Sequence, residues 1–234
     1  MQYVFMSNVI DLLQQQHLIW PGSQQQNCTE TISSGYPDLD ELLGGGFPVR
    51  GVTELCTPTA IGELRLLTPC LQSAGNKRLT AFINPPGYLS SNYLLTHGLD
   101  PNNILLIRSD QDTQALWAAE QCLNSGCCST VLLWHPSLEI HQAKRLQLAC
   151  ETGNALHFYF PTRKTHSLTL PVSLSLTLSP VTTGLHISIT KRKGGWTQNG
   201  FILDMTRQWP VLTQREPLHH HHPIATPARY RKKA

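Results

Sequence analysis

Short runs of β-forming residues alternate with segments of helical spacing between residues 52 and 160, and this alternation constrains the fold more than any other feature. The expected strands lie at residues 52–56, 79–84, 104–107, 130–134 and 156–160. The expected helices lie between them, at residues 62–74, 88–97, 113–123 and 139–152. Apolar strands that alternate with helices need crossover connections, which build a parallel sheet with helices on both faces. The sequence therefore predicts an α/β fold with a mostly parallel central sheet flanked by helices.

The pattern changes after residue 171. Residues 172–178 and 185–190 alternate strictly between apolar and polar side chains, and a further β-rich run follows at 201–205. Strict alternation is typical of antiparallel strands with one face in water. We therefore expect antiparallel strands at the C-terminal side of the sheet, with residues 191–196 as a basic turn between two of them.

The chain divides into three parts by composition. Residues 1–29 are expected to form an N-terminal arm, residues 30–209 the folded domain, and residues 210–234 a tail rich in proline, histidine and basic residues. The tail has too few apolar residues to bury a core, so we expect it to be disordered. Its four-histidine run at 219–222 has ligands that suit a transition metal but no shaped pocket, and no metal site is predicted there.

Positive charge is concentrated at the C-terminal side. Residues 191–234 carry nine lysine and arginine residues against two acidic ones, a net charge of +7, whereas residues 1–190 carry −4. Such asymmetry is typical of proteins that bind an acidic partner or nucleic acid. A solvated tail that only aids solubility has the same signature, so charge alone leaves both interpretations open.

Composition argues against several classes of protein. No apolar run approaches the roughly 20 residues of a membrane-spanning helix, and the first residues lack the basic and apolar blocks of an export signal. The seven cysteines are scattered and contain no C-x-x-C pair, which favours reduced thiols over a disulfide framework or a zinc site. We therefore expect a cytoplasmic protein without membrane contact, metal or cofactor, in which Cys127 and Cys128 are buried small hydrophobes.

The stretch at residues 32–67, ISSGYPDLDELLGGGFPVRGVTELCTPTAIGELRLL, resembles the opening of the RecA-type ATPase core. In that family a Ser-Gly turn and a short L-D-x-x-L-G-G-G helix precede a strand and then the phosphate-binding loop, G-x-x-x-x-G-K-[ST]. Residues 57–64 stand at the place of that loop, and Gly62 is the one defining residue that they keep. The resemblance implies a RecA-like core.

Each replaced position removes part of the chemistry of the loop. Thr57 replaces the first glycine, Glu63 replaces the lysine that meets the phosphates, and Leu64 replaces the hydroxyl residue that holds magnesium. A carboxylate about 4 Å from a phosphate charge costs about 4 kcal/mol at an effective dielectric near 20. The helix that begins near Gly62 could still attract an anion, but Glu63 can satisfy the helix dipole itself.

Two further positions depart from the family pattern. Asn84 follows the second strand where the family carries a catalytic acid, and Trp134 stands where it carries a magnesium-associated aspartate. The neighbouring His135 is interpreted as a surface or structural histidine, because no acidic residue near it in sequence would orient it as a base. The sequence therefore predicts a protein that is not an enzyme and has no nucleotide cofactor.

A more specific resemblance is carried by residues 51–67, GVTELCTPTAIGELRLL, by the strand–proline element at 83–86 and by the segments 115–121 and 131–134. These stretches resemble the ImuA family, over about residues 30–206. The resemblance implies a non-catalytic accessory protein of the SOS response to DNA damage, which acts in mutagenic translesion synthesis and DNA repair. The implied partners are an ImuB-type inactive relative of Y-family polymerases and an error-prone replicative-type polymerase, with docking on RecA and self-association left open.

A second family shares part of this core. Residues 116–134 and 153–155 resemble SulA, a family that blocks cell division by binding FtsZ. The chain departs from SulA because it keeps the lead-in at 32–48 and has a long C-terminal extension, so the ImuA resemblance is preferred. A nucleotide-binding protein without the phosphate-loop chemistry is the third and least favoured interpretation.

Basic and aromatic side chains outside the loop are candidate contacts for DNA or a protein partner. Lysine and arginine side chains that neutralise phosphates would give weak, salt-sensitive binding to single-stranded DNA, and Trp196 would either stack on a base or cap the edge of the core. Tyr230 in the tail would anchor the segment on a partner while the charges around it steer association. The candidate contacts are Arg163, Lys164, Lys191, Arg192, Lys193, Trp196, Arg229, Tyr230, Arg231, Lys232 and Lys233.

Overall fold

A computed structural model of the chain describes residues 30–75, 78–163, 170–194 and 198–210. Several predictions fall outside these ranges: the N-terminal arm, the tail from residue 211 with its histidine run, and the expected end of the basic turn. The candidate contacts outside them are Lys164, Trp196, Arg229, Tyr230, Arg231, Lys232 and Lys233.

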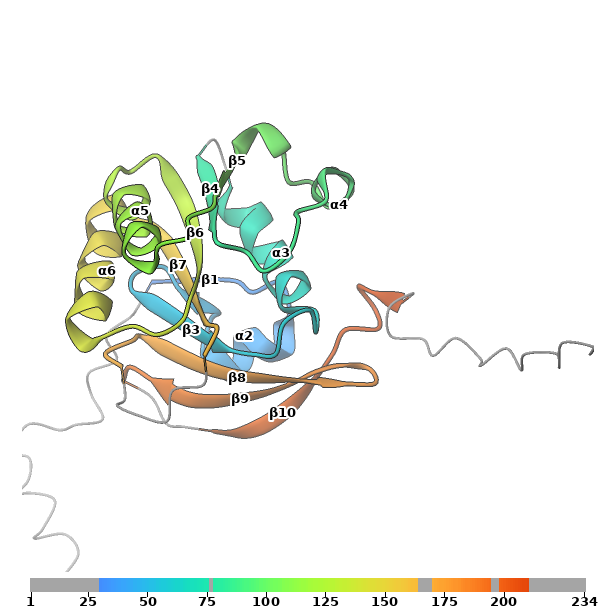
Figure 1. The fold of residues 1–234 in the computed structure, drawn as a ribbon. Coiled ribbons are helices and arrows are strands. Elements are labelled where there is room, and N and C mark those ends of the chain that lie inside the picture. The colour runs from blue at the N-terminus through green and yellow to red at the C-terminus, as the bar shows by residue number, and fades with distance from the viewer. Residues whose placement is uncertain (1–29, 76–77, 164–169, 195–197, 211–234) are drawn as a thin grey trace, which may run out of the picture.

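A sheet of eight strands runs through the described domain in the order β10-β9-β8-β3-β7-β6-β4-β5 (Figure 1). Each neighbouring pair in the part β8-β3-β7-β6-β4-β5 is parallel. The pairs β8–β9 and β9–β10 are antiparallel. This confirms the predicted α/β fold with antiparallel strands at its C-terminal side. The strands are β3 (Val52–Cys56), β4 (Leu79–Ile83), β5 (Ile104–Ile107), β6 (Cys128–His135), β7 (Leu156–Pro161), β8 (Leu174–Val181), β9 (Gly184–Arg192) and β10 (Gln198–Asp204).

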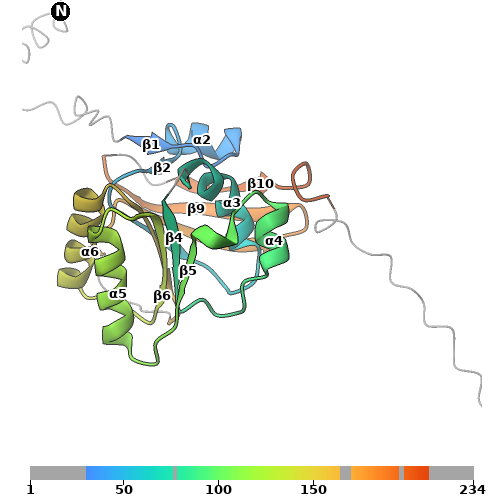
Figure 2. The ribbon, with the colours of Figure 1, turned by 90° about the horizontal axis from the view of Figure 1, so that it is seen from above.

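Helices cover both faces of the sheet (Figure 2). Helices α5 and α6 pack on one face, whereas α2, α3 and α4 pack on the other, so that the apolar side chains form two separate cores. Strand β6 serves both cores, because Leu132 and Trp134 point into one and Val131 and Leu133 into the other. The helices are α2 (Pro37–Leu43), α3 (Glu63–Ala74), α4 (Ser91–Thr96), the short 3₁₀ helix η1 (Pro101–Asn103), α5 (Asp112–Asn124) and α6 (Ile140–Gly153).

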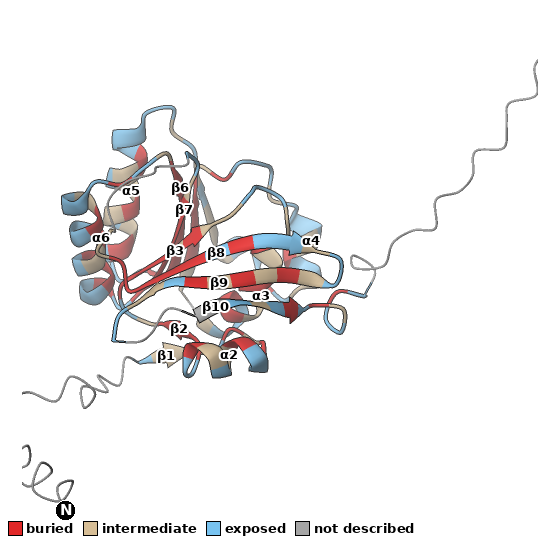
Figure 3. Cartoon of the chain, turned by 90° about the horizontal axis from the view of Figure 1, so that it is seen from below, coloured by how far each residue is buried: buried red, intermediate tan, exposed pale blue. Residues whose placement is uncertain are grey.

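The antiparallel strands keep one face in water over part of their length. Along β9 and from Thr177 onward in β8 buried and more exposed residues alternate (Figure 3), whereas Ser173 and Ser175, on the polar side of the predicted alternation, are buried. Thr177 and Thr190 are both exposed. Strand β8 runs antiparallel to β9 and parallel to β3, so it joins the antiparallel strands to the parallel part of the sheet. Leu174, Leu176 and Leu178 anchor it from within the core that contains α2 and α3.

At the level of single elements, one sheet was missed and two predictions are wrong. A two-stranded sheet of β1 (Thr31–Ile32) and β2 (Phe47–Pro48) was not predicted, because two-residue strands carry no periodicity. The turn after β9 begins later than expected, since Lys191 and Arg192 still belong to the strand. Cys127 is exposed rather than buried, whereas Cys128 is buried as predicted.

The glycines that follow α2 allow the chain to turn back against β1. Gly44 ends the helix in the left-handed conformation at φ 64°, and its N–H bonds the Glu41 carbonyl. Gly46, at φ 116°, lies so close to β1 that a Cβ atom would sit 2.1 Å from the Ile32 carbonyl oxygen. The G-G-G segment is therefore a structural requirement of the lead-in.

Trp209 fastens the end of the described chain to the start of the domain. Its indole N–H donates to the Tyr36 hydroxyl at 3.0 Å, and that hydroxyl donates to the Arg65 carbonyl oxygen at 3.1 Å. The indole also stacks on Tyr93, with ring centroids 6.3 Å apart. Within the described ranges, no helix is both long and apolar enough to cross a membrane.

Candidate functional site

The loop between β3 and α3 is folded around the carboxylate of Glu63, the first residue of α3. The backbone N–H of Ala60 donates to Oε1 at 3.0 Å, and those of Ile61 and Gly62 donate to Oε2 at 3.0 and 3.1 Å. Ala60 and Gly62 have positive φ angles, 64° and 109°, which turn the successive N–H groups toward one point. Glu63 is 5% exposed. The side chain thus fills a backbone nest of the kind that binds phosphate in related loops.

This geometry confirms the expectation that Glu63 satisfies the helix N-terminus itself. An incoming phosphate would have to displace a carboxylate held by three N–H groups, and it would meet no lysine at that position. The other replaced residues are also engaged. The Thr57 hydroxyl donates to the Pro58 carbonyl at 2.8 Å, and Leu64 packs against the core that contains α3.

Trp134 fills the position at the end of β6 where the family carries an acid. The ring stacks on Phe160 at the end of β7, with centroids 4.4 Å apart and planes 5° from parallel, and lies 6.4 Å from Phe82 in β4. Trp134 is 6% exposed. Three aromatic rings therefore occupy the carboxyl ends of three neighbouring strands, where an ATPase would hold metal and water.

Asn84 ties the ends of β4 and β5 together. Its side-chain amide donates to the Ser109 carbonyl at 2.9 Å and accepts from the Ser109 N–H at 2.8 Å, and its backbone is left-handed at φ 52°. The donor and the acceptor of the amide are thus both used to hold the two strand ends together. A carboxylate at this position would keep one of these hydrogen bonds and lose the other.

His135 is the last residue of β6 and is 6% exposed, which excludes the surface position that the sequence left open. Its Nδ1 atom has no hydrogen-bond partner among the described residues. Of the two interpretations that the sequence left open, the surface one is therefore wrong.

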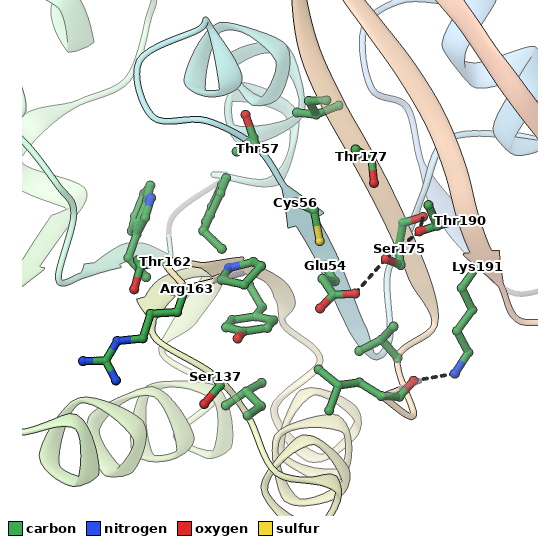
Figure 4. A pocket seen from close by; sticks show the side chains of 18 of the residues that line it. Glu54, Cys56, Thr57, Ser137, Thr162, Arg163, Ser175, Thr177, Thr190 and Lys191 are labelled. Carbon is green, nitrogen blue, oxygen red and sulfur yellow. Dashed lines mark hydrogen bonds between the residues drawn. The ribbon is translucent and has the colours of Figure 1, made fainter. Parts of the chain in front are cut away.

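A cavity of about 1540 Å³ opens beside the loop, on the α6 side of the sheet (Figure 4). Glu54 and Cys56 of β3 form its floor together with Ser175 of β8 and Thr190 of β9. The Ser175 hydroxyl donates to Glu54 Oε2 at 2.7 Å, and the Thr190 hydroxyl donates to Ser175 Oγ at 2.9 Å. Glu54 and Ser175 are paired directly in the parallel register of β3 and β8, so the sheet itself positions the two side chains that form the first of these hydrogen bonds.

The Glu54 charge affects two neighbouring groups in the cavity. Burial, and secondly the Glu54 carboxylate, raises the pKa of Cys56 to about 11. The pKa of Tyr159 is raised by the same two causes in the same order, and by a smaller effect of Cys56. Both groups therefore stay protonated at neutral pH, and the Cys56 thiol is a poor nucleophile.

Three of the four described candidate contacts divide into two places. Arg163 and Lys191 line the cavity, and the Lys191 ammonium donates to the Leu170 carbonyl. Arg192 instead reaches the C-terminal end of α2, where its guanidinium donates to the Leu42 carbonyl at 3.4 Å and lies against Gly44. Lys193 is exposed. The predicted basic turn is thus partly a structural clamp on the helix end.

Glu54 and Ser175 were not singled out in the sequence, although one signal was present. A glutamate within the apolar strand VTELC is costly to bury and is retained where it has a partner or a ligand. Among the described residues, no three His, Cys, Asp or Glu side chains gather closely enough to hold a metal ion.

Comparison with known proteins matches residues 6–137 to the family of the RecA N-terminal domain. The RecA protein of Crocosphaera subtropica is 33% identical over 115 residues, which are 48% of this chain and 32% of that protein. The cell division inhibitor SulA of Photorhabdus laumondii is 36% identical over 95 residues, 40% of this chain and 54% of that protein. The chain therefore spans between a third and about half of the length of these relatives.

One solved structure adds a fold comparison. The crystal structure of SulA from Pseudomonas aeruginosa aligns with 47% of this chain and 96% of its own, at 28% identity and a TM-score of 0.41.

Proposed function

This chain belongs to the family of the RecA N-terminal domain, and from that premise we propose that it is a non-catalytic adaptor of SOS-induced mutagenic translesion DNA synthesis. In this proposal it is a cytoplasmic protein that acts beside an ImuB-type partner and an error-prone polymerase. Its contribution is protein contact rather than nucleotide turnover.

The observation that supports the non-catalytic part of the proposal is the carboxylate of Glu63 in the backbone nest of the loop. A loop that supplies its own anion has no vacant N–H groups for a nucleotide phosphate, and the same carboxylate repels one. The Trp134–Phe160 stack supports the same conclusion, because it occupies the strand ends with apolar rings. The eight-stranded sheet is meanwhile intact, as a docking platform requires.

Two measurements test this function. Calorimetric titration of the purified chain with ATP and magnesium should give no binding heat, and turnover of the triphosphate would contradict the proposal. Affinity capture from DNA-damaged cells should retain an ImuB-type protein with the wild-type chain. A chain that retains no polymerase relative, under conditions where a known partner pair is recovered, would refute the adaptor role.

Direct contact with single-stranded DNA is part of the same proposal. Lys193 is the residue to test, because it is exposed, whereas Lys191 and Arg192 already donate to backbone carbonyls. Lys193→Glu should weaken binding at low salt and make its salt dependence shallower. Unchanged affinity would remove DNA contact at this turn.

A second candidate function is the inhibition of cell division, which the 36% identity to a SulA protein favours. The discriminating experiment is expression of the chain in cells without DNA damage. Filamentation together with capture of FtsZ supports this alternative, and normal division together with capture of a polymerase relative supports the adaptor.

A further inference from the structure

The carboxylate of Glu54 is held in one orientation before any ligand arrives. It accepts the Ser175 hydroxyl at 2.7 Å, and Ser175 in turn accepts the Thr190 hydroxyl at 2.9 Å. Ser175 is 6% exposed, so its proton has few alternatives to this bond. A group fixed in this way loses little conformational freedom on binding, which is the general condition for an efficient recognition site.

Glu54 lacks a cationic partner within the part of the chain that the structure describes. No lysine, arginine or histidine nitrogen there lies within 4.0 Å of its carboxylate, and among the described side chains the Ser175 hydroxyl is the one that donates a hydrogen bond to it. A carboxylate that is partly removed from water is costly unless it is paired.

The Glu54 carboxylate suits a flat cation. A carboxylate can accept two parallel N–H groups of a guanidinium. Arginine matches this geometry better than lysine, because its planar group donates in a fork. The rings of Trp134 and Phe160 also line the cavity, but they are buried and stack on each other, so they serve the core.

The rim of the cavity has the opposite charge. Lys144, Arg163 and Lys191 line it, and the Lys191 ammonium also donates to the Leu170 carbonyl. The two other carboxylates in the lining are already engaged: Glu63 by three backbone N–H groups, and Glu139 by His141 at 3.1 Å and by the start of α6. Acidic residues on either side of a bound cation would therefore be attracted to the rim.

The volume favours a peptide over a small molecule. About 1540 Å³ exceeds the 300–1,000 Å³ that is typical of small-molecule sites. A nucleic acid would bring phosphates toward the Glu54 carboxylate, which repels them. We propose that this cavity binds an arginine side chain of a partner protein, presented by an extended segment with acidic residues on both sides.

This inference deepens the proposed function and rests on it in one respect, that the ligand belongs to another protein. It names the chemistry that the adaptor recognises: guanidinium against Glu54 and carboxylates against the lysines of the rim. The test below uses synthetic peptides, so it succeeds or fails independently of the capture of an ImuB-type protein.

The probe is a short fluorescent peptide with one central arginine between two pairs of acidic residues, compared with the same peptide in which neutral citrulline replaces arginine. Binding to the full chain is measured by fluorescence anisotropy at low ionic strength. We expect the citrulline peptide, and separately the variant Glu54→Gln, to weaken binding about tenfold, equivalent to about 1.4 kcal/mol. The two changes together should cause no further loss, because they remove one interaction.

The variants are chosen to separate recognition from folding. Glu54→Gln keeps an oxygen that accepts from Ser175, and Glu41→Gln, on the exposed surface of α2, makes the same change in net charge away from the cavity. Glu41→Gln should bind as the wild type does, and Lys144→Gln should weaken binding and reduce its salt dependence. If Glu54→Gln fails to fold, the two peptides on the wild-type chain decide the question.

Five results would overturn the proposal. The first four are equal binding of the arginine and citrulline peptides, unchanged binding by a folded Glu54→Gln variant, absence of binding by the wild-type chain, and displacement of the peptide by agmatine at matching affinity. The fourth would assign the cavity to a small cation. Displacement by an oligonucleotide that is insensitive to Glu54→Gln would assign the rim to nucleic acid and would also refute the peptide.

Discussion

The rings of Trp134 and Phe160 lie face to face, 4.4 Å apart at their centroids and 5° from parallel, at the ends of two neighbouring strands. In an α/β sheet this is the edge where ligands bind. Here the same edge is filled by apolar contacts, so it contributes to the stability of the domain.

Replacement of Trp134 by alanine should therefore lower stability markedly. Loss of a buried tryptophan typically costs about 3–5 kcal/mol, and Trp134 is 6% exposed. The matched control is Trp117→Ala in α5, because Trp117 is 62% exposed and should change stability by about 0.5 kcal/mol or less. Urea unfolding of both variants gives the comparison, and equal losses would show that the stack is not a stabilising element.

The loop offers a second prediction, about Glu63. Glu63→Ala leaves three partly buried N–H groups without their acceptor, so we expect a loss of about 1 kcal/mol of stability. The same change reopens the nest, and inorganic phosphate should raise the melting temperature of the variant but not that of the wild type.

Glu41→Ala, on the exposed surface of α2, is the control for the loss of one negative charge. A stabilisation by phosphate that is equal in the wild type, Glu63→Ala and Glu41→Ala would be a general salt effect. It would show that the nest is not an anion site even when it is empty.

The sequence predicted the fold well because the apolar pattern is strong in the central strands. Strands β3 and β5 have the predicted bounds, and α3 begins one residue later than expected. Each is an apolar run or an amphipathic helix that its own residues specify. The sheet of β1 and β2 was missed because it depends on the close approach of Gly46 to Ile32, which no local pattern encodes.

The site was predictable in part. The loop and its replaced residues were identified by their order along the chain, and the response of Glu63 followed from helix electrostatics. The pairing of Glu54 with Ser175 was not, because it joins residues 121 apart in sequence through the register of β3 and β8. Strand order and register are set by tertiary packing, and a single sequence does not reveal them.

A buried histidine should make stability depend on pH. His157 in β7 is 1% exposed, and burial lowers its pKa to about 4, an effect that a nearby Val131 carbonyl partly offsets. Below pH 6.5, the ordinary pKa of histidine, His157 binds a proton in the unfolded chain but stays neutral in the folded chain. Stability therefore falls as the pH drops from 6.5 toward 4. Between pH 7 and pH 5 this one group should remove about 2 kcal/mol.

Urea unfolding at the two pH values checks this dependence. His157→Gln should lessen the difference between pH 7 and pH 5 by about 2 kcal/mol, even if the variant is less stable at both. His141→Gln, a change at an exposed histidine, should keep the full difference. A His157→Gln variant with the pH dependence of the wild type would mean that other groups cause it.

The end of the described chain gives the last prediction. Truncation after Trp209 should leave thermal unfolding nearly unchanged, because the indole keeps its bond to the Tyr36 hydroxyl and its stack on Tyr93. Truncation after Gln208 removes both and uncovers the core around α3, so it should cost about 3–5 kcal/mol, as loss of a buried tryptophan does. The substitution Trp209→Ala in the full chain should reproduce the second result.

If truncation after Trp209 is as damaging as truncation after Gln208, residues beyond 209 stabilise the domain and the predicted boundary is wrong. If it preserves stability but weakens capture of an ImuB-type partner, the basic segment that ends at Lys233 serves recognition.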